Sequence, residues 1–245
     1  MDVLVTDKTG TLTEWHTSFT SAFAIGADIT EAEHFVLGLV STEVDLAHGE
    51  VSIVGQNRLD AAVWEAPQTH DFSPGSDVRV DIIPFDHQHR MTSVLVVDPS
   101  GAQQIVTKGS VEDVMPLCLD VPPQALLRLN EQYDAGARVI AVASRQVVGM
   151  SAIVPAEEVR LTLAGFLVLV DKPKANVRES LIGLAELGIT VKLATGDNAR
   201  VTERNRVAEK VCRYLGLALA GTKSQNYQAY AAVGLGCGFS WRRRQ

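Results

Sequence analysis

Long apolar stretches are missing from this sequence of 245 residues. A membrane-spanning helix needs about 20 consecutive apolar residues, whereas the best apolar run, residues 161–170, is half as long and ends at Asp171. Such a run is typical of a buried central strand. The N-terminus is acidic and enters a strand at once, which argues against a signal peptide. We therefore expect a chain that has no transmembrane segment and is soluble by itself.

Cysteine and positive charge are also scarce. The three cysteines, Cys118, Cys212 and Cys237, have no metal-ligand spacing and no evident pairing, which is typical of reduced thiols in a cytosolic protein. Lysine and arginine number 22 against 29 aspartate and glutamate residues, so the net charge is −7. We therefore expect no nucleic-acid partner, because broad nucleic-acid binding requires a basic face. A hydrophobic fraction of 46% is sufficient for a folded core.

The most informative stretch lies at the N-terminus, where Asp7-Lys8-Thr9-Gly10-Thr11-Leu12-Thr13 follows the aliphatic run Val3-Leu4-Val5. The aliphatic run predicts a buried strand, and Asp7 then lies at its carboxyl end, where open α/β sheets place their ligands. Gly10 allows a tight turn and a close approach to an anion. An aspartate in this setting can attack a phosphoryl group and carry it as an aspartyl phosphate.

This motif resembles the phosphorylation motif of the P-type cation-transporting ATPases. The resemblance implies that Asp7 is the phosphate acceptor and that Mg²⁺ is held by Asp7 and by the backbone carbonyl of Thr9. It also implies that Lys8 offsets charge near the site and that Thr11 contacts the phosphate.

A second motif, Thr195-Gly196-Asp197, follows a predicted strand at 189–194 and precedes a predicted amphipathic helix at 199–215. It matches the Thr-Gly-Asp of the same family. The resemblance implies that Thr195 and Gly196 grip the transferring phosphoryl group, which a helix N-terminus also favours. Asp197 would orient the ribose or a water molecule.

The resemblance assigns six further residues to nucleotide binding: Asp60, Phe85, Lys108, Gly109, Arg138 and Asp171. Phe85 would stack on the adenine ring, and His87 stands where the family often has a basic residue. Lys108-Gly109-Ser110 resembles the family's Lys-Gly-Ala, in which the lysine closes the adenosine pocket and meets phosphate charge.

The other three assignments depend on position within the family pattern. Arg138 matches an arginine that contacts the nucleotide phosphates, and Asp60 falls near the family's acidic residue at the adenine amino group. Asp171 begins Asp171-Lys172-Pro173-Lys174, which resembles the family's Asp-Pro-Pro-Arg stretch at a strand end.

These patterns predict an α/β fold. We expect an incomplete, haloacid-dehalogenase-like parallel-sheet phosphorylation domain at 1–14 and 156–217, with residues 161–170 as a central strand. We expect an inserted α+β nucleotide-binding domain at 15–155, entered through a hinge at 14–30. Within the insertion, Thr30 and Glu33 form a capping box at the start of a helix, and alternating apolar residues predict antiparallel strands.

Residues 218–245 form an atypical tail that is rich in glycine and alanine, has no acidic residue and ends in three arginines and a glutamine. The resemblance covers residues 2–217, and the later aspartate loop that completes the family's Mg²⁺ site is absent. We expect a frame-shifted or disordered tail, and a fragment that lacks the transmembrane and actuator parts of a pump. The loss of a metal ligand predicts weakened catalysis or an inactive chain.

The resemblance implies ATP and Mg²⁺ as ligands and phosphoryl transfer to Asp7 at the cytoplasmic face of a membrane. A transported cation is expected only in a complete pump. The lead-in to Asp7 and the segments at 57–61 and 211–217 resemble most the magnesium-transporting bacterial subgroup. Two alternatives stay open: a nucleotide-binding remnant without turnover, and a soluble haloacid-dehalogenase-type phosphatase. Such a phosphatase usually has a second aspartate at the position of Thr9.

Overall fold

The structure is a computed structural model that describes residues 2–7, 10–26, 29–43, 57–71, 78–195 and 227–231. The chain divides into two compact units. The smaller unit comprises Met1–Trp15 and Pro173–Gln245, and the larger unit comprises His16–Lys172.

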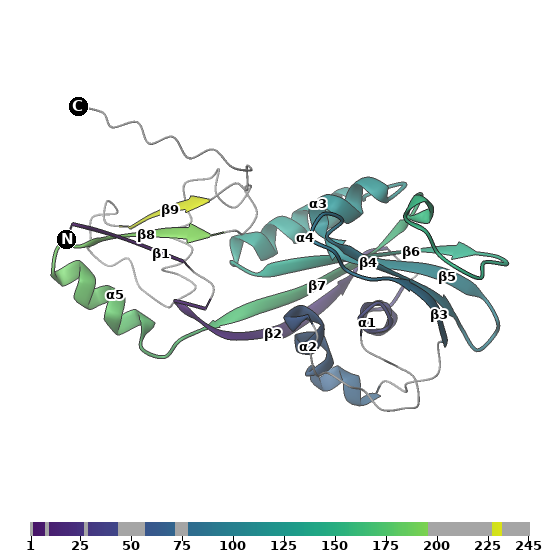
Figure 1. Ribbon diagram of the computed structural model, residues 1–245, viewed down its shortest axis with the longest axis horizontal. Coiled ribbons are helices and arrows are strands. Elements are labelled where there is room, and N and C mark those ends of the chain that lie inside the picture. The colour runs from purple at the N-terminus through teal and green to yellow at the C-terminus, as the bar shows by residue number, and fades with distance from the viewer. Residues whose placement is uncertain are drawn as a thin grey trace. The chain divides into compact units, whose positions relative to one another are not determined.

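A six-stranded sheet dominates the larger unit, with strand order β2-β7-β6-β5-β4-β3 (Figure 1). In that order the strands are Thr13–Ala24, Thr162–Pro173, Arg138–Val147, Gln103–Ser110, Met91–Val97 and Val78–Ile83. The pairs from β7 to β3 are all antiparallel. β-branched and aliphatic residues fill the central strands and pack well on a pleated surface. The turn Asp98–Gly101 between β4 and β5 is closed by backbone and Asp98 hydrogen bonds.

Helices cover both faces of this sheet. One face packs against α1 (Glu31–Val40) and α2 (Arg58–Trp64), and its core includes Leu39, Val63 and Leu167. The other face packs against α3 (Val111–Val114) and α4 (Pro123–Asp134), around Phe166. The predicted capping box of α1 is confirmed, with Thr30 and Glu33 exchanging hydrogen bonds. Short 3₁₀ helices lie at Pro67–Asp71, Met115–Leu117 and Pro155–Glu157.

The smaller unit contains parallel strands. β1 (Val3–Asp7), β8 (Thr190–Thr195) and β9 (Tyr227–Ala231) lie side by side in the order β1-β8-β9, seen in Figure 1 as purple, green and yellow arrows. Helix α5 (Val177–Glu186) packs against β8. The backbone bonds of this small sheet bring segments from both ends of the chain together.

The expected fold class is wrong. The described residues form mainly a curled antiparallel sheet with few helices. Their parallel ladders, β1–β8 and β8–β9, make a small three-stranded sheet and not a parallel sheet of the haloacid dehalogenase type. In the run 161–170, expected in a parallel sheet, all residues after Leu161 belong to β7, which pairs antiparallel with β6. Their continuous apolar run reflects burial of both faces by helices, which occurs in either kind of sheet. The expected hinge at 14–30 is largely strand β2.

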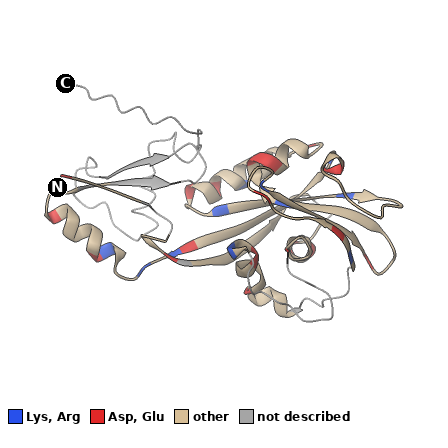
Figure 2. Ribbon diagram, in the orientation of Figure 1, with Lys and Arg blue, Asp and Glu red and all other residues tan. Residues whose placement is uncertain are grey.

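Within the described residues, no helix combines the length and apolar character needed to cross a membrane. Figure 2 shows acidic and basic residues distributed over the helices and strands of both units.

Candidate functional site

The first residue of the phosphorylation motif and the first residue of the Thr-Gly-Asp motif lie at the same end of the small parallel sheet. Asp7, the last residue of β1, lies opposite Ala194 of β8, and Thr195 is the next residue of β8. Because the strands are parallel, the segments that leave them emerge at the same edge. The structure describes only the backbone of Asp7 and Thr195. Lys8, Thr9, Gly196 and Asp197 lie outside the described residues.

The turn at Gly10, in the second half of the acceptor motif, is held by a lysine. Gly10 has a φ of 79°, a conformation that favours glycine, and its N–H donates to the Thr13 hydroxyl at 3.1 Å. The Lys174 ammonium donates to the Gly10 carbonyl at 2.8 Å, and the Lys174 N–H donates to the Leu12 carbonyl at 3.0 Å. Thr11 is exposed on this turn. Lys174 therefore places a positive charge beside the segment that leaves Asp7.

In the larger unit, the structure brings two of the predicted nucleotide residues into direct contact. Lys108 of β5 donates to Asp60 of α2 across 2.6 Å, and their side chains are only 5% and 3% exposed. The second oxygen of Asp60 accepts the Glu43 N–H at 3.0 Å. Asn57 caps α2 by accepting the Leu59 N–H at 3.0 Å, which begins the helix just before Asp60. Both oxygens of the buried Asp60 carboxylate thus have partners within the protein.

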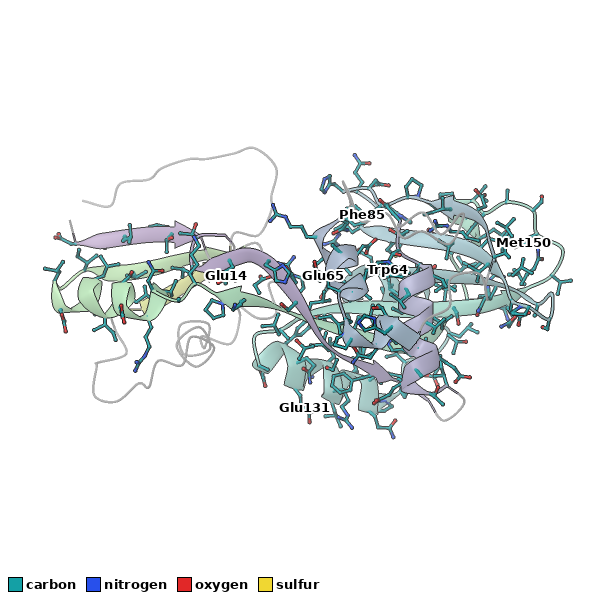
Figure 3. The ribbon with its side chains drawn as sticks, turned by 90° about the horizontal axis from the view of Figure 1, so that it is seen from below. Glu14, Trp64, Glu65, Phe85, Glu131 and Met150 are labelled. Carbon is teal, nitrogen blue, oxygen red and sulfur yellow. The ribbon has the colours of Figure 1, made fainter. Side chains whose placement is uncertain are left out.

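Phe85 lies on the loop between β3 and β4. Its ring is at the margin of the larger unit, 37% of the residue is exposed, and Trp64 lies further inside (Figure 3). The Phe85 N–H donates to the Glu43 carboxylate. His87 meets the Phe85 ring edge-on, with ring centroids 5.7 Å apart. An exposed aromatic ring on an anchored backbone can accept a flat base by stacking.

The loop after Phe85 is shaped by Asp86. Its carboxylate accepts the N–H groups of His89 and Gln88 at 2.7 Å each. These hydrogen bonds, led by that from His89, lower the pKa of Asp86 and keep it ionised. The His89 ring then contacts the buried Glu158 carboxylate at 2.6 Å, which ties the loop to the segment after the 3₁₀ helix Pro155–Glu157. Glu158 also accepts from the Ser93 hydroxyl of β4.

Arg138 and Asp171, two further predicted residues, also lie together. The Arg138 guanidinium donates to Asp171 at 3.5 Å, and the Thr17 hydroxyl donates to the same carboxylate at 2.8 Å. Arg138 begins β6 and lies two and four residues before Ile140 and Val142, so the three share one face of the strand. That face packs against α1 and α2. The strand registers place Lys108 opposite Val142, so Lys108 and Arg138 share that face of the sheet.

Gly109 has a steric role in β5. A Cβ atom at this position would lie 2.5 Å from Met91 Cγ and 2.6 Å from the Arg90 carbonyl oxygen. Only glycine permits this approach of β5 to the start of β4, which follows the Phe85 loop.

Sequence reasoning did not select Glu43 or Lys174 as site residues. Lys174 belongs to the stretch that begins at Asp171, so the family pattern carried a signal for it. Glu43 follows helix α1 without any motif, and only the fold brings it to Asp60 and Phe85. Within the described ranges, no group of three or more histidine, cysteine, aspartate or glutamate residues is arranged to hold a metal ion.

Comparison with known proteins agrees with the motifs. No family model matches the chain. It is 32% identical over 234 residues to a protein of Salmonella typhimurium strain 14028s, and 31% identical over 235 residues to one of Escherichia coli K12. Over 89% of its length the chain is therefore homologous to the P-type ATPases, and the predicted family resemblance is confirmed. Both relatives are named "Magnesium-transporting ATPase, P-type 1", and the chain spans 24% of their length.

Proposed function

We propose that this chain binds ATP and accepts its γ-phosphoryl group on Asp7, as the catalytic portion of a P-type ATPase that transports magnesium or another cation. The observation that carries the proposal is the β1–β8 register, which brings the ends of two motif-bearing strands to one edge. The homology to magnesium-transporting pumps supports the same reaction. Transport itself would belong to a complete pump with its membrane and actuator parts.

In the proposed reaction, a carboxylate oxygen of Asp7 attacks the γ-phosphorus of ATP. A new P–O bond forms to Asp7 while the bond to the bridging oxygen of the β-phosphate breaks, and ADP leaves. Water later cleaves the aspartyl phosphate to release inorganic phosphate. Thr195 and the Gly196 amide would hold the transferring group, and positioning and charge neutralisation supply most of the rate in such transfers.

The residues assigned to Mg²⁺ suit its chemistry. The Asp7 carboxylate and the Thr9 carbonyl are oxygen donors, which Mg²⁺ prefers, and the remaining positions would be filled by phosphate and water oxygens. Bound there, Mg²⁺ would neutralise charge on the transferring phosphoryl group. Lys174 adds positive charge next to the Gly10 turn through its own contact.

Nucleotide binding without turnover is the second candidate. The observation that favours it is the connected set Phe85, Glu43, Asp60 and Lys108, which is held by hydrogen bonds within the larger unit and does not involve Asp7. Arg138, whose side chain is 37% exposed, would meet phosphate charge, and Phe85 would stack on the base. A phosphatase of the haloacid dehalogenase type would instead hydrolyse phosphate monoesters.

The test incubates the purified chain with γ-labelled ATP and Mg²⁺, quenches in acid and treats the protein with hydroxylamine. We expect acid-stable, hydroxylamine-labile label that is lost in Asp7→Asn. Asp2→Asn, which changes a carboxylate just before the same strand, serves as the matched control and should retain the label. Bound ATP without label would support the non-turnover candidate. Absence of both label and ATP binding would overturn both.

A further inference from the structure

Asp60, which the family pattern places at the adenine amino group, is not available to bind that group. Asp60 is 2% exposed as a residue, and its two oxygens are engaged by the Lys108 ammonium and the Glu43 N–H. Separating Asp60 from Lys108 would leave a buried charge without a partner, which is strongly unfavourable. Recognition of the base therefore calls for a different acceptor near Phe85.

Glu43 occupies the position between the stacking ring and the buried ion pair. Its N–H donates to Asp60 and its carboxylate accepts the N–H of Phe85. It is only partly buried, in contrast to Asp60. A carboxylate has about four lone-pair sites, so accepting one N–H leaves capacity for a ligand.

The backbone around Glu43 is fixed from several sides. The carbonyl of Thr42 accepts from the Arg79 guanidinium at 2.6 Å, and its hydroxyl accepts from the Trp64 indole N–H at 2.8 Å. The Thr42 hydroxyl also donates to the Leu39 carbonyl at 2.6 Å. A polar group held in place before binding loses little entropy on binding, which favours selective recognition.

We infer that the Glu43 carboxylate recognises the 6-amino group of adenine beside Phe85 and sets the preference for adenine nucleotides. This inference rests on the proposed nucleotide binding. A carboxylate only accepts hydrogen bonds, so it pairs with the amino group of adenine and repels the 6-oxo group of guanine. Asp60, held by Lys108, positions Glu43 directly by accepting its N–H.

The experiment measures displacement of a fluorescent ATP analogue by ATP, by GTP and by purine riboside triphosphate, which lacks the 6-amino group. The wild-type chain should prefer ATP over the purine riboside by about tenfold, the size of one hydrogen bond to a charged group. Glu43→Ala should abolish this preference. Glu43→Gln keeps an acceptor for Phe85 but adds an amide donor, so it should raise the affinity for GTP relative to ATP.

Two control variants separate recognition from stability. Glu65→Gln changes an exposed carboxylate that contacts His16 in the same unit, and it should keep the wild-type ratios. Asp60→Asn should weaken all three nucleotides together. Ratios measured on one preparation do not depend on the fraction that is folded, so a partly unfolded variant still answers the question.

Two results would overturn the role of Glu43 while leaving nucleotide binding intact. The first is unchanged affinity ratios in both Glu43 variants, and the second is a wild-type chain that does not distinguish ATP from purine riboside triphosphate. A wild-type chain that binds none of the three nucleotides would overturn the proposed function, and the role of Glu43 with it.

Discussion

In the larger unit, Asp60 and Lys108 meet through their side chains, 2.6 Å apart and almost fully buried. In the smaller unit, Asp7 and Thr195 are brought to one edge by backbone pairing between β1 and β8. The first arrangement ties a candidate binding site to the stability of the fold, because each partner is costly to leave buried without the other. In the second arrangement the positioning bonds are made by the backbone, so a side chain at a strand end can be changed without breaking them.

The strongest test of this difference removes one partner of the buried pair. Asp60→Ala leaves the Lys108 ammonium buried without a counter-charge, and should lower the free energy of unfolding by about 3–5 kcal/mol. Urea denaturation followed by fluorescence measures the loss. Asp7→Asn should leave stability close to wild type, because the β1–β8 bonds are made by the backbone.

The double variant Asp60→Leu with Lys108→Met removes both charges and is the control for Asp60→Ala. It should recover most of the lost stability, since an apolar pair of similar volume is often as stable as a buried ion pair. A double variant as unstable as Asp60→Ala would mean that the loss comes from packing and that the charge pair has no special role.

The next largest expected effect is a loss of folding stability at low pH, and it arises from His34 in the larger unit. His34 is fully buried and neither ring nitrogen has a hydrogen-bond partner. Burial lowers the pKa of His34 from 6.5 to about 4, and the nearby Phe166 backbone opposes this shift only in part. The native state therefore keeps His34 neutral, while the unfolded chain protonates it below pH 6.5.

The stability that neutral His34 allows is fully present above pH 6.5 and is lost as the pH falls toward 4. The free energy of unfolding should fall by up to about 1.4 kcal/mol per pH unit in this range. Urea midpoints measured between pH 7 and pH 4 should drop less steeply in His34→Leu than in wild type. His70→Leu, at an exposed histidine on the 3₁₀ helix Pro67–Asp71, is the comparison. Equal slopes in wild type and His34→Leu would contradict the prediction.

The sequence was sufficient for local structure and insufficient for sheet assignment. The capping box of Thr30 and Glu33 and the strands around residues 91–97 follow from short-range pattern, and the structure has both. Strand β7 shows the limit: an apolar run reports burial on both faces, and burial does not tell which strand lies alongside. Pairing partners and direction depend on the whole fold.

The candidate site divides in the same way. Asp60 and Lys108 were each selected by position within a family pattern, 48 residues apart in the chain, but no pattern implied that they neutralise each other. Glu43 could not be found at all, because its role depends on two hydrogen bonds made across the fold, to Asp60 and from Phe85. The chemical assignments of Asp7, Thr195 and the nucleotide residues stay predictions until labelling and binding are measured.

The last pair of variants changes one glycine in each unit, and the variant in the smaller unit has the smallest expected effect. Gly183 lies within α5 of the smaller unit, and a Cβ atom there would meet no heavy atom within 4 Å. Gly183→Ala should therefore stabilise α5 by about 0.5–1 kcal/mol, because alanine loses less backbone entropy than glycine in a helix. Gly109→Ala in the larger unit should destabilise by about 1–3 kcal/mol, since its Cβ would overlap the Arg90 carbonyl oxygen. Hydrogen exchange resolved by segment measures both: slower exchange of α5 amides in the first variant, faster exchange of β4 and β5 amides in the second. Faster exchange of α5 in Gly183→Ala would mean that this helix packs more tightly than its open glycine position implies.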